Sequence, residues 1–254
     1  MTSRYTKELF ELSTQPVAAE QVLRLVSSPR SSASDLARVV ETDPALAARV
    51  MRLANSPYYG AARRVASTQH AIVMLGFDTV RGLAVSAAFS LLDGRGEMGP
   101  DGFWRHSVTT AAAASTIAKK MGVSPADAFS VGLLHDIGAV LLHRRDPVKF
   151  TEAMQAPSMS RVVSAEIAAF GVTHANEGAE ALDAWGFPRP FVEAVALHEH
   201  GVELAEFAVG RILKVAEAIS LELAPMPGYP TAPDLEHLLA SVRLHDSDYD
   251  AITS

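Results

Sequence analysis

The sequence predicts an all-α protein made of many short to medium helices, and three observations support this fold class. Apolar residues recur at helical spacing, as with Leu46, Val50 and Leu53 at positions i, i+4 and i+7. Ser124 and Pro125 form a helix-start signal, because serine caps a helix and proline is favoured at its first position. No segment shows the two-residue apolar alternation or the hairpin turns that are typical of β-strands.

Turn and linker signals divide this helical pattern into four consecutive parts. Residues 93–102 hold four glycines and one proline, which predicts a linker loop. The linker separates an N-terminal helical lobe, residues 1–92, from a second helical lobe, residues 103–224. A proline-rich stretch then begins a C-terminal extension, residues 225–254, whose repeated aspartates predict an exposed tail. We therefore expect a two-lobed, multi-helix domain.

Helix boundaries are best marked in the first lobe. Asp43 and Pro44 predict the start of one helix, and Asn55 and Ser56 predict its end. Gly76 lies inside an apolar helical run, where it predicts either a helix end or a close contact between helices.

The charge is distributed unevenly between the two lobes. The 254 residues have a formal net charge of −7. Residues 1–92 contain 10 Lys and Arg against 7 Asp and Glu, whereas residues 93–254 contain 12 against 22. Such asymmetry suggests that the lobes have different partners. Four arginines of the first lobe lie near two tyrosines in the sequence: Arg49, Arg52, Arg63 and Arg64. An excess of three positive charges is nevertheless small for a nucleic-acid-binding protein, so we expect no nucleic-acid binding.

Composition also excludes several other classes of protein. Cysteine is absent, which excludes disulfides, thiolate metal sites and cysteine nucleophiles. The first ten residues lack the apolar core of a signal peptide, and the longest apolar stretch, residues 71–92, is interrupted by Asp78 and Arg81. We therefore expect a soluble, cytoplasmic protein with no membrane partner.

Residues 129–142 form an almost wholly apolar segment with a histidine and an aspartate at its centre. We expect this segment to be one helix that is buried on all sides. His135 and Asp136 are adjacent, so on a helix their side chains project about 100° apart. A buried carboxylate costs several kcal/mol unless it is paired or bound to a metal. Other helices must therefore supply partners for these two side chains.

A search for polar residues that lie on the apolar face of a predicted helix selects six residues, which we expect to point inward. They are His106, His135, Asp136, His174, His198 and Glu217. Imidazole and carboxylate suit Fe, Mn or Zn, so this set is a candidate metal site. A plainer interpretation stays open for each member: a lone histidine can be a hydrogen-bonded core residue, Asp136 can pair with Arg105, and Glu217 can pair with Lys214 or Arg211.

With these residues in place, the chain resembles the HDOD family, a branch of the HD superfamily found in bacterial signalling proteins, over roughly residues 13–220. In the first lobe the resemblance rests on Asp43-Pro44-Ala45-Leu46, Leu53-Ala54-Asn55-Ser56, Tyr58-Tyr59-Gly60, Ala71-Ile72 and Leu75-Gly76. In the second it rests on Phe103-Trp104-Arg105-His106-Ser107, Gly132-Leu133-Leu134-His135-Asp136-Ile137-Gly138, and His174 with Trp185-Gly186-Phe187-Pro188. The resemblance implies an HD-like ligand order that the six selected residues match.

The chain also departs from the catalytic members of the superfamily, the HD-GYP phosphodiesterases among them. Their late aspartate is Glu217 here, and the lysine that serves the phosphate is Ala139. The acid expected before the first histidine is Gly102, and no Gly-Tyr-Pro signature follows His198. Loss of these groups weakens phosphate binding and the assembly of two metals more than it weakens metal binding itself.

The resemblance implies a bacterial signal-transduction module that is not catalytic and acts on signalling proteins in trans. A divalent metal in a degenerate HD site is compatible with that function, and we assign no catalytic residue. The alternative is a metal-dependent phosphohydrolase acting on a nucleotide or cyclic dinucleotide, with His106, His135, Asp136 and Glu217 as ligands. No residue in the sequence supports a cyclic dinucleotide in particular.

Overall fold

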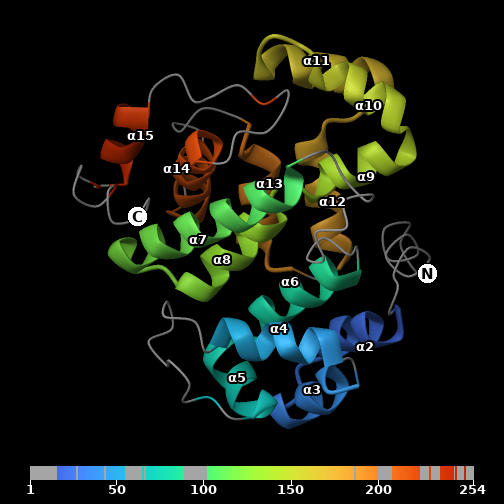
Figure 1. Ribbon diagram of the computed structural model, residues 1–254, viewed down its shortest axis with the longest axis vertical. Coiled ribbons are helices and arrows are strands. Elements are labelled where there is room, and N and C mark those ends of the chain that lie inside the picture. Colours follow the sequence, from blue (N-terminus) through green and yellow to red (C-terminus); the bar gives the residue numbers. More distant parts are fainter. Residues whose placement is uncertain are drawn as a thin grey trace. The chain divides into compact units, whose positions relative to one another are not determined.

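A computed structural model confirms the all-α fold class. It describes residues 16–26, 28–42, 44–54, 65, 67–88, 102–185, 187–199, 208–223, 229, 235–242, 244 and 249. Every regular element in these ranges is a helix (Figure 1). None of the described helices is long and apolar enough to cross a membrane.

The chain forms two compact units, and the first consists of residues 1–95 together with 184–186. Its helices are α2 (Pro16–Val26), α3 (Ala33–Val40), α4 (Pro44–Ala54), α5 (Thr68–Leu75) and α6 (Phe77–Ala88). α2 packs against α6, and α5 packs against both α3 and α4. Fully buried Leu36, Ile72 and Leu75 belong to the core of this unit.

Two of the boundaries predicted in this unit are confirmed. α4 begins at Pro44, and α5 ends at Leu75 with Gly76 as its C-cap, whose positive φ of 80° favours glycine. Asp43, Asn55 and Ser56 lie outside the described residues.

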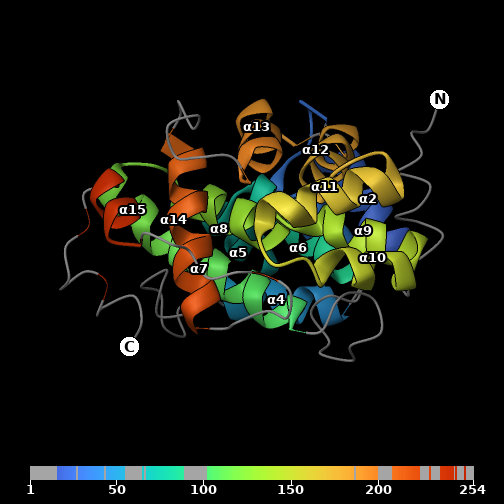
Figure 2. The ribbon, with the colours of Figure 1, turned by 90° about the horizontal axis from the view of Figure 1, so that it is seen from above.

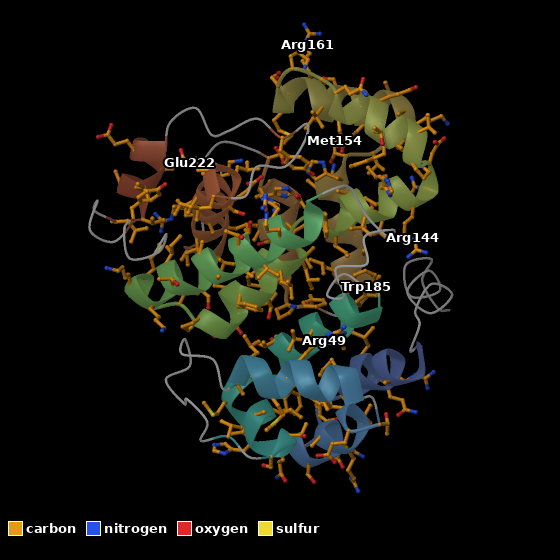
Figure 3. The ribbon with its side chains drawn as sticks, viewed as in Figure 1. Arg49, Arg144, Met154, Arg161, Trp185 and Glu222 are labelled. Atoms are coloured by element: carbon orange, nitrogen blue, oxygen red, sulfur yellow. The ribbon has the colours of Figure 1, made fainter. Side chains whose placement is uncertain are left out.

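The second unit, residues 96–183 and 187–254, holds the remaining helices. They are α7 (Phe103–Met121), α8 (Pro125–Leu134), α9 (Ile137–Arg145), α10 (Pro147–Met154), α11 (Met159–Phe170), α12 (His174–Ala184), α13 (Arg189–Leu197), α14 (Ala208–Leu223) and α15 (Leu235–Ser241). α7 packs against α8 and α14, and α10 packs against α9 and α11 (Figures 1 and 2). Buried Met154 points into the unit from α10, whereas Arg161 points outward from α11 (Figure 3).

The helix predicted at residues 129–142 is in fact two helices. α8 starts at Pro125, with Ser124 accepting a hydrogen bond from the Asp127 N–H as expected, but it ends at Leu134. His135 and Asp136 form a turn, and Asp136 has φ −96° and ψ 16° before α9 begins. In an unbroken helix these neighbours would diverge, so the turn lets both side chains face one place.

Two glycines allow helices of the second unit to approach each other unusually closely. A Cβ atom on Gly132 of α8 would lie 2.7 Å from the Cα atom of Ala111 on α7. A Cβ atom on Gly138 of α9 would lie 1.9 Å from the backbone oxygen of His174 on α12. These contacts bring the His135-Asp136 turn against helices that carry other predicted site residues.

The C-terminal extension is not only an exposed tail. α15 packs on α14, and its Leu238 and Leu239 join a core with Ile219 of α14. Tyr229, from the proline-rich stretch, is buried. The expectation of an exposed tail overlooked a helical pattern, because Leu235, Leu238, Leu239 and Val242 stand at positions i, i+3, i+4 and i+7. The aspartates that suggested a tail, Asp246, Asp248 and Asp250, lie outside the described residues, as does the expected linker except for Gly102.

Candidate metal centre

The six residues predicted from the sequence converge at one buried position in the second unit. They come from α7 (His106), the α8–α9 turn (His135 and Asp136), the first residue of α12 (His174), the end of α13 (His198) and α14 (Glu217). None of the six residues is more than 3% exposed.

Asp136 lies between two pairs of histidines. Its Oδ2 atom is 3.7 Å from Nε2 of His106 and 3.4 Å from Nε2 of His135. Its Oδ1 atom is 3.7 Å from Nε2 of His174 and 3.2 Å from Nε2 of His198. Within each pair the two Nε2 atoms are only 3.2 Å (His106, His135) and 3.3 Å (His174, His198) apart. The carboxylate thus presents one oxygen to each pair.

Hydrogen bonds at the far side of each ring direct the Nε2 lone pairs inward. Nδ1 of His135 lies 2.8 Å from the Gly132 backbone oxygen, and Nδ1 of His198 lies 2.6 Å from the Val195 backbone oxygen. A carbonyl oxygen only accepts, so each Nδ1 donates, and Nε2 is the atom that can bind a metal once it has given up its proton.

His106 is oriented by Ser220 of α14 in the same way. The Ser220 hydroxyl donates to the His106 backbone oxygen at 3.0 Å, and its oxygen accepts from Nδ1 of His106 at 3.1 Å. Histidine ligands of metals characteristically donate their second N–H to such outer partners.

Glu166, which the sequence analysis missed, fixes His174. This fully buried carboxylate of α11 accepts from Nδ1 of His174 at 2.8 Å and from its backbone N–H at 3.0 Å. A carboxylate–histidine pair of this kind sets the tautomer and raises the basicity of a metal ligand. The available sequence signal for Glu166 was its position four residues after Val162, on the same face of the helix.

Glu199 is a second residue that was missed. Its Oε1 atom lies 3.2 Å from Nε2 of His174 and 3.3 Å from Nε2 of His198, and its side chain is only 6% exposed. Glu217 belongs with His198 and Glu199, whose ligand atoms lie within 4.8 Å of one another, rather than with the first histidine pair. The sequence did contain a signal for Glu199, because it follows His198 directly, just as Asp136 follows His135.

The structure also tests the simple ion pairs that the sequence allowed for Asp136 and Glu217. Arg105 is exposed, which makes it a poor partner for the fully buried Asp136. Nζ of Lys214 does lie 3.5 Å from Oε2 of Glu217, as that alternative proposed. Neither oxygen of Asp136 has a hydrogen bond of acceptable geometry from the part of the chain that the structure describes.

The histidines of the site differ in the direction in which their pKa values are shifted. Burial and the neighbouring His135 lower the pKa of His106 to about 4. Burial acts the same way on His198, but the contacts with Asp136 and Glu199 outweigh it and raise its pKa to about 10. The pKa of His174 is likewise raised well above its usual value, because Glu166 and Glu199 outweigh burial. Burial opposes ionisation of Asp136, yet His135, His198 and His174 hold its pKa well below the usual range.

This donor set fits a divalent metal. Two unprotonated Nε2 atoms at 3.2 or 3.3 Å repel each other unless a proton or a metal ion lies between them, and neither buried oxygen of Asp136 has a hydrogen bond of acceptable geometry from the described residues. Neighbouring ligand atoms of one metal are separated by about 3 Å when each metal–ligand distance is about 2.1 Å. Imidazole with carboxylate, and no thiolate, matches Mn, Fe or Zn.

Replacing Glu166 with glutamine tests the orientation of His174. Glu166→Gln keeps the size of the side chain but removes the charge that holds Nδ1–H, so we expect metal affinity to fall about 10- to 100-fold. The measurement is a competition titration with a metallochromic chelator. Glu152→Gln, the same change at an exposed position on α10, is the control and should leave the affinity unchanged. Equal affinity in both variants would show that Glu166 does not support a metal ligand.

Comparison with known proteins agrees with the sequence resemblance. The family model of the HDOD domain matches residues 12–201. The response regulator MmoQ of Methylococcus capsulatus str. Bath is 30% identical, with 93% of this chain and 95% of that chain covered and a TM-score of 0.54. No curated protein matches the chain.

Two further solved structures share the fold at lower identity. An HDOD domain protein from Geobacter sulfurreducens is 23% identical, with 98% of this chain and 91% of that chain covered and a TM-score of 0.61. A presumed metal-dependent phosphohydrolase from Shewanella amazonensis SB2B is 22% identical, with coverage of 97% and 94% and a TM-score of 0.63. Since the family model covers most of the chain, this protein belongs to the HDOD family.

Proposed function

We propose that this chain is a signal-transduction module that holds a divalent metal, Fe, Mn or Zn, in its HD site and acts through signalling proteins rather than by catalysis. The observation that carries the metal assignment is Asp136, whose two buried oxygens receive no hydrogen bond from the described residues and face four inward Nε2 atoms. The similarity to a response regulator supports the signalling role.

The surroundings of the site favour a regulatory metal over a catalytic one. Ala139, at the position of the phosphate-binding lysine in catalytic relatives, is fully buried in α9 and offers no cation. Gly102, at the position of their additional acid, has no side chain to bridge metals.

A phosphohydrolase is the second candidate, and one observation favours it. Asp136 directs a separate oxygen to each histidine pair, which is how a carboxylate bridges the two ions of a two-metal hydrolase. Divalent ions bound there would polarise a phosphoryl oxygen and assist attack by water. The side chains of this chain would supply the ligands and, through Glu166, their orientation.

The two functions are separated by metal analysis followed by an activity screen. We expect purified protein to contain Fe, Mn or Zn, and to show no metal-dependent hydrolysis of bis(p-nitrophenyl) phosphate, cyclic dinucleotides or nucleotides after loading with Mn²⁺ or Fe²⁺. Turnover that disappears in Asp136→Ala would establish the phosphohydrolase instead. Protein that binds no divalent metal under any loading condition would contradict both proposals.

A further inference from the structure

Tyr229 covers the metal centre from outside the part of the chain that matches the family. It follows α14 and lies 28 residues beyond the end of the match at residue 201. Its ring centroid is 6.0 Å from that of His106 and 6.3 Å from that of His174, so it contacts one histidine of each pair. Tyr229 is buried, with 7% of its surface exposed.

The hydroxyl of Tyr229 has no hydrogen-bond partner among the described residues. A buried hydroxyl that loses its partner is costly, so such groups almost always have one. Burial and the charges of Asp136, Glu166 and Glu199 raise the pKa of Tyr229 well above its usual value, yet none of these carboxylates accepts the hydroxyl hydrogen. A phenol next to a metal centre with an unused donor is suited to an acceptor atom that belongs to a ligand.

Lys214 adds a positive charge beside Glu217, one of the six site residues. It lies one helical turn before Glu217 on α14, with Nζ 3.5 Å from Oε2 of that residue. This distance is the outer limit of a hydrogen bond, and the side chain is 24% exposed, so Nζ can turn toward an incoming group. Burial opposes the charge of Lys214, but Glu217, Glu199 and Asp136 outweigh it and raise the pKa of this lysine.

We infer that Tyr229 and Lys214 form an anion-recognition side of the HD site, which takes an oxyanion of the phosphate class. Tyr229 donates its hydroxyl hydrogen to one oxygen of the ligand, and Lys214 provides the counter-charge. This inference rests on the metal binding proposed above, because Asp136, Glu199 and Glu217 would repel an anion unless a divalent cation neutralised them. It assigns recognition, and no chemical step, to these two residues.

The test is calorimetric titration of metal-loaded protein with inorganic phosphate and, in a separate arm, dimethyl phosphate. The first arm probes free phosphate or a monoester and the second probes a diester, and binding of either supports the inference. Tyr229→Phe should weaken that binding about tenfold or more, because a hydrogen bond to a charged group is lost. Lys214→Met should weaken it by a similar factor, and metal stoichiometry should stay that of the wild type in both variants.

Matched controls make the same two substitutions at other positions. Tyr249→Phe removes a hydroxyl that donates to Glu222 on the outside of α14, and Lys149→Met removes an exposed lysine paired with Asp146. Both should bind the oxyanion like the wild type. Metal-loaded protein that binds neither probe, or that binds one equally well in the Tyr229→Phe and Lys214→Met variants, would overturn the inference and leave metal binding intact. Failure to load metal would overturn the proposed function and this inference with it.

Discussion

Asp136→Asn is expected to abolish stable metal binding while leaving the helical fold in place. Asparagine keeps the shape of the side chain but removes the negative charge that both histidine pairs share. Removal of an outer partner costs about 10- to 100-fold in metal affinity, so we expect the loss of this central ligand to exceed a hundredfold. Metal content after dialysis, measured by inductively coupled plasma mass spectrometry, gives the result directly.

A matched variant separates this effect from a general loss of charge. Asp183→Asn makes the same change at an exposed position of α12 and should retain the wild-type metal content. Circular dichroism of both variants checks that the helices remain. Wild-type metal content in Asp136→Asn would mean that the metal is held elsewhere.

Gly138→Ala is expected to destabilise the protein strongly and to weaken its metal site. The new Cβ atom would lie 1.9 Å from the His174 backbone oxygen and 2.6 Å from the Gly178 backbone nitrogen, so α9 and α12 must move apart. Overpacking against backbone costs up to about 3 kcal/mol, and it would displace His174 from Asp136. Urea unfolding reports the loss of stability, and the chelator titration reports the loss of affinity.

Gly178→Ala provides the comparison from the opposite side of the same contact. A Cβ atom there would come no closer than 3.1 Å to Gly138 and 3.4 Å to Val195. Alanine raises helix propensity at both positions, so the difference between the variants isolates the clash. We expect Gly178→Ala to lose much less stability, and similar losses in both variants would argue against a close α9–α12 contact.

The fold class and most of the site could be predicted because they depend on local patterns. Helical periodicity and the Ser124-Pro125 signal require only neighbouring residues, and both reappear in the structure. Each of the predicted ligands is a polar side chain on an apolar stripe, and burial of such a side chain demands partners. The six polar residues on apolar helix faces therefore indicated a common buried site from the sequence alone.

The missed residues have roles that only tertiary packing defines. Glu166 acts through His174 from another helix, so its stripe alone could equally have been a buried ion pair. The turn at His135-Asp136 contains no glycine or proline, and the glycines that flank it, Gly132 and Gly138, lie inside α8 and α9. Tyr229 lies in a proline-rich stretch whose pattern predicts no burial at all.

X-ray absorption spectroscopy of the metal-loaded protein tests the central claim most directly. We predict a nearest shell of nitrogen and oxygen atoms at about 2.1 Å, with the outer scattering of several imidazole rings, because four histidine Nε2 atoms surround Asp136. Asp136→Asn should lose this spectrum along with the metal. A metal with only oxygen neighbours and no imidazole scattering would contradict the assignment of the HD site as a metal centre.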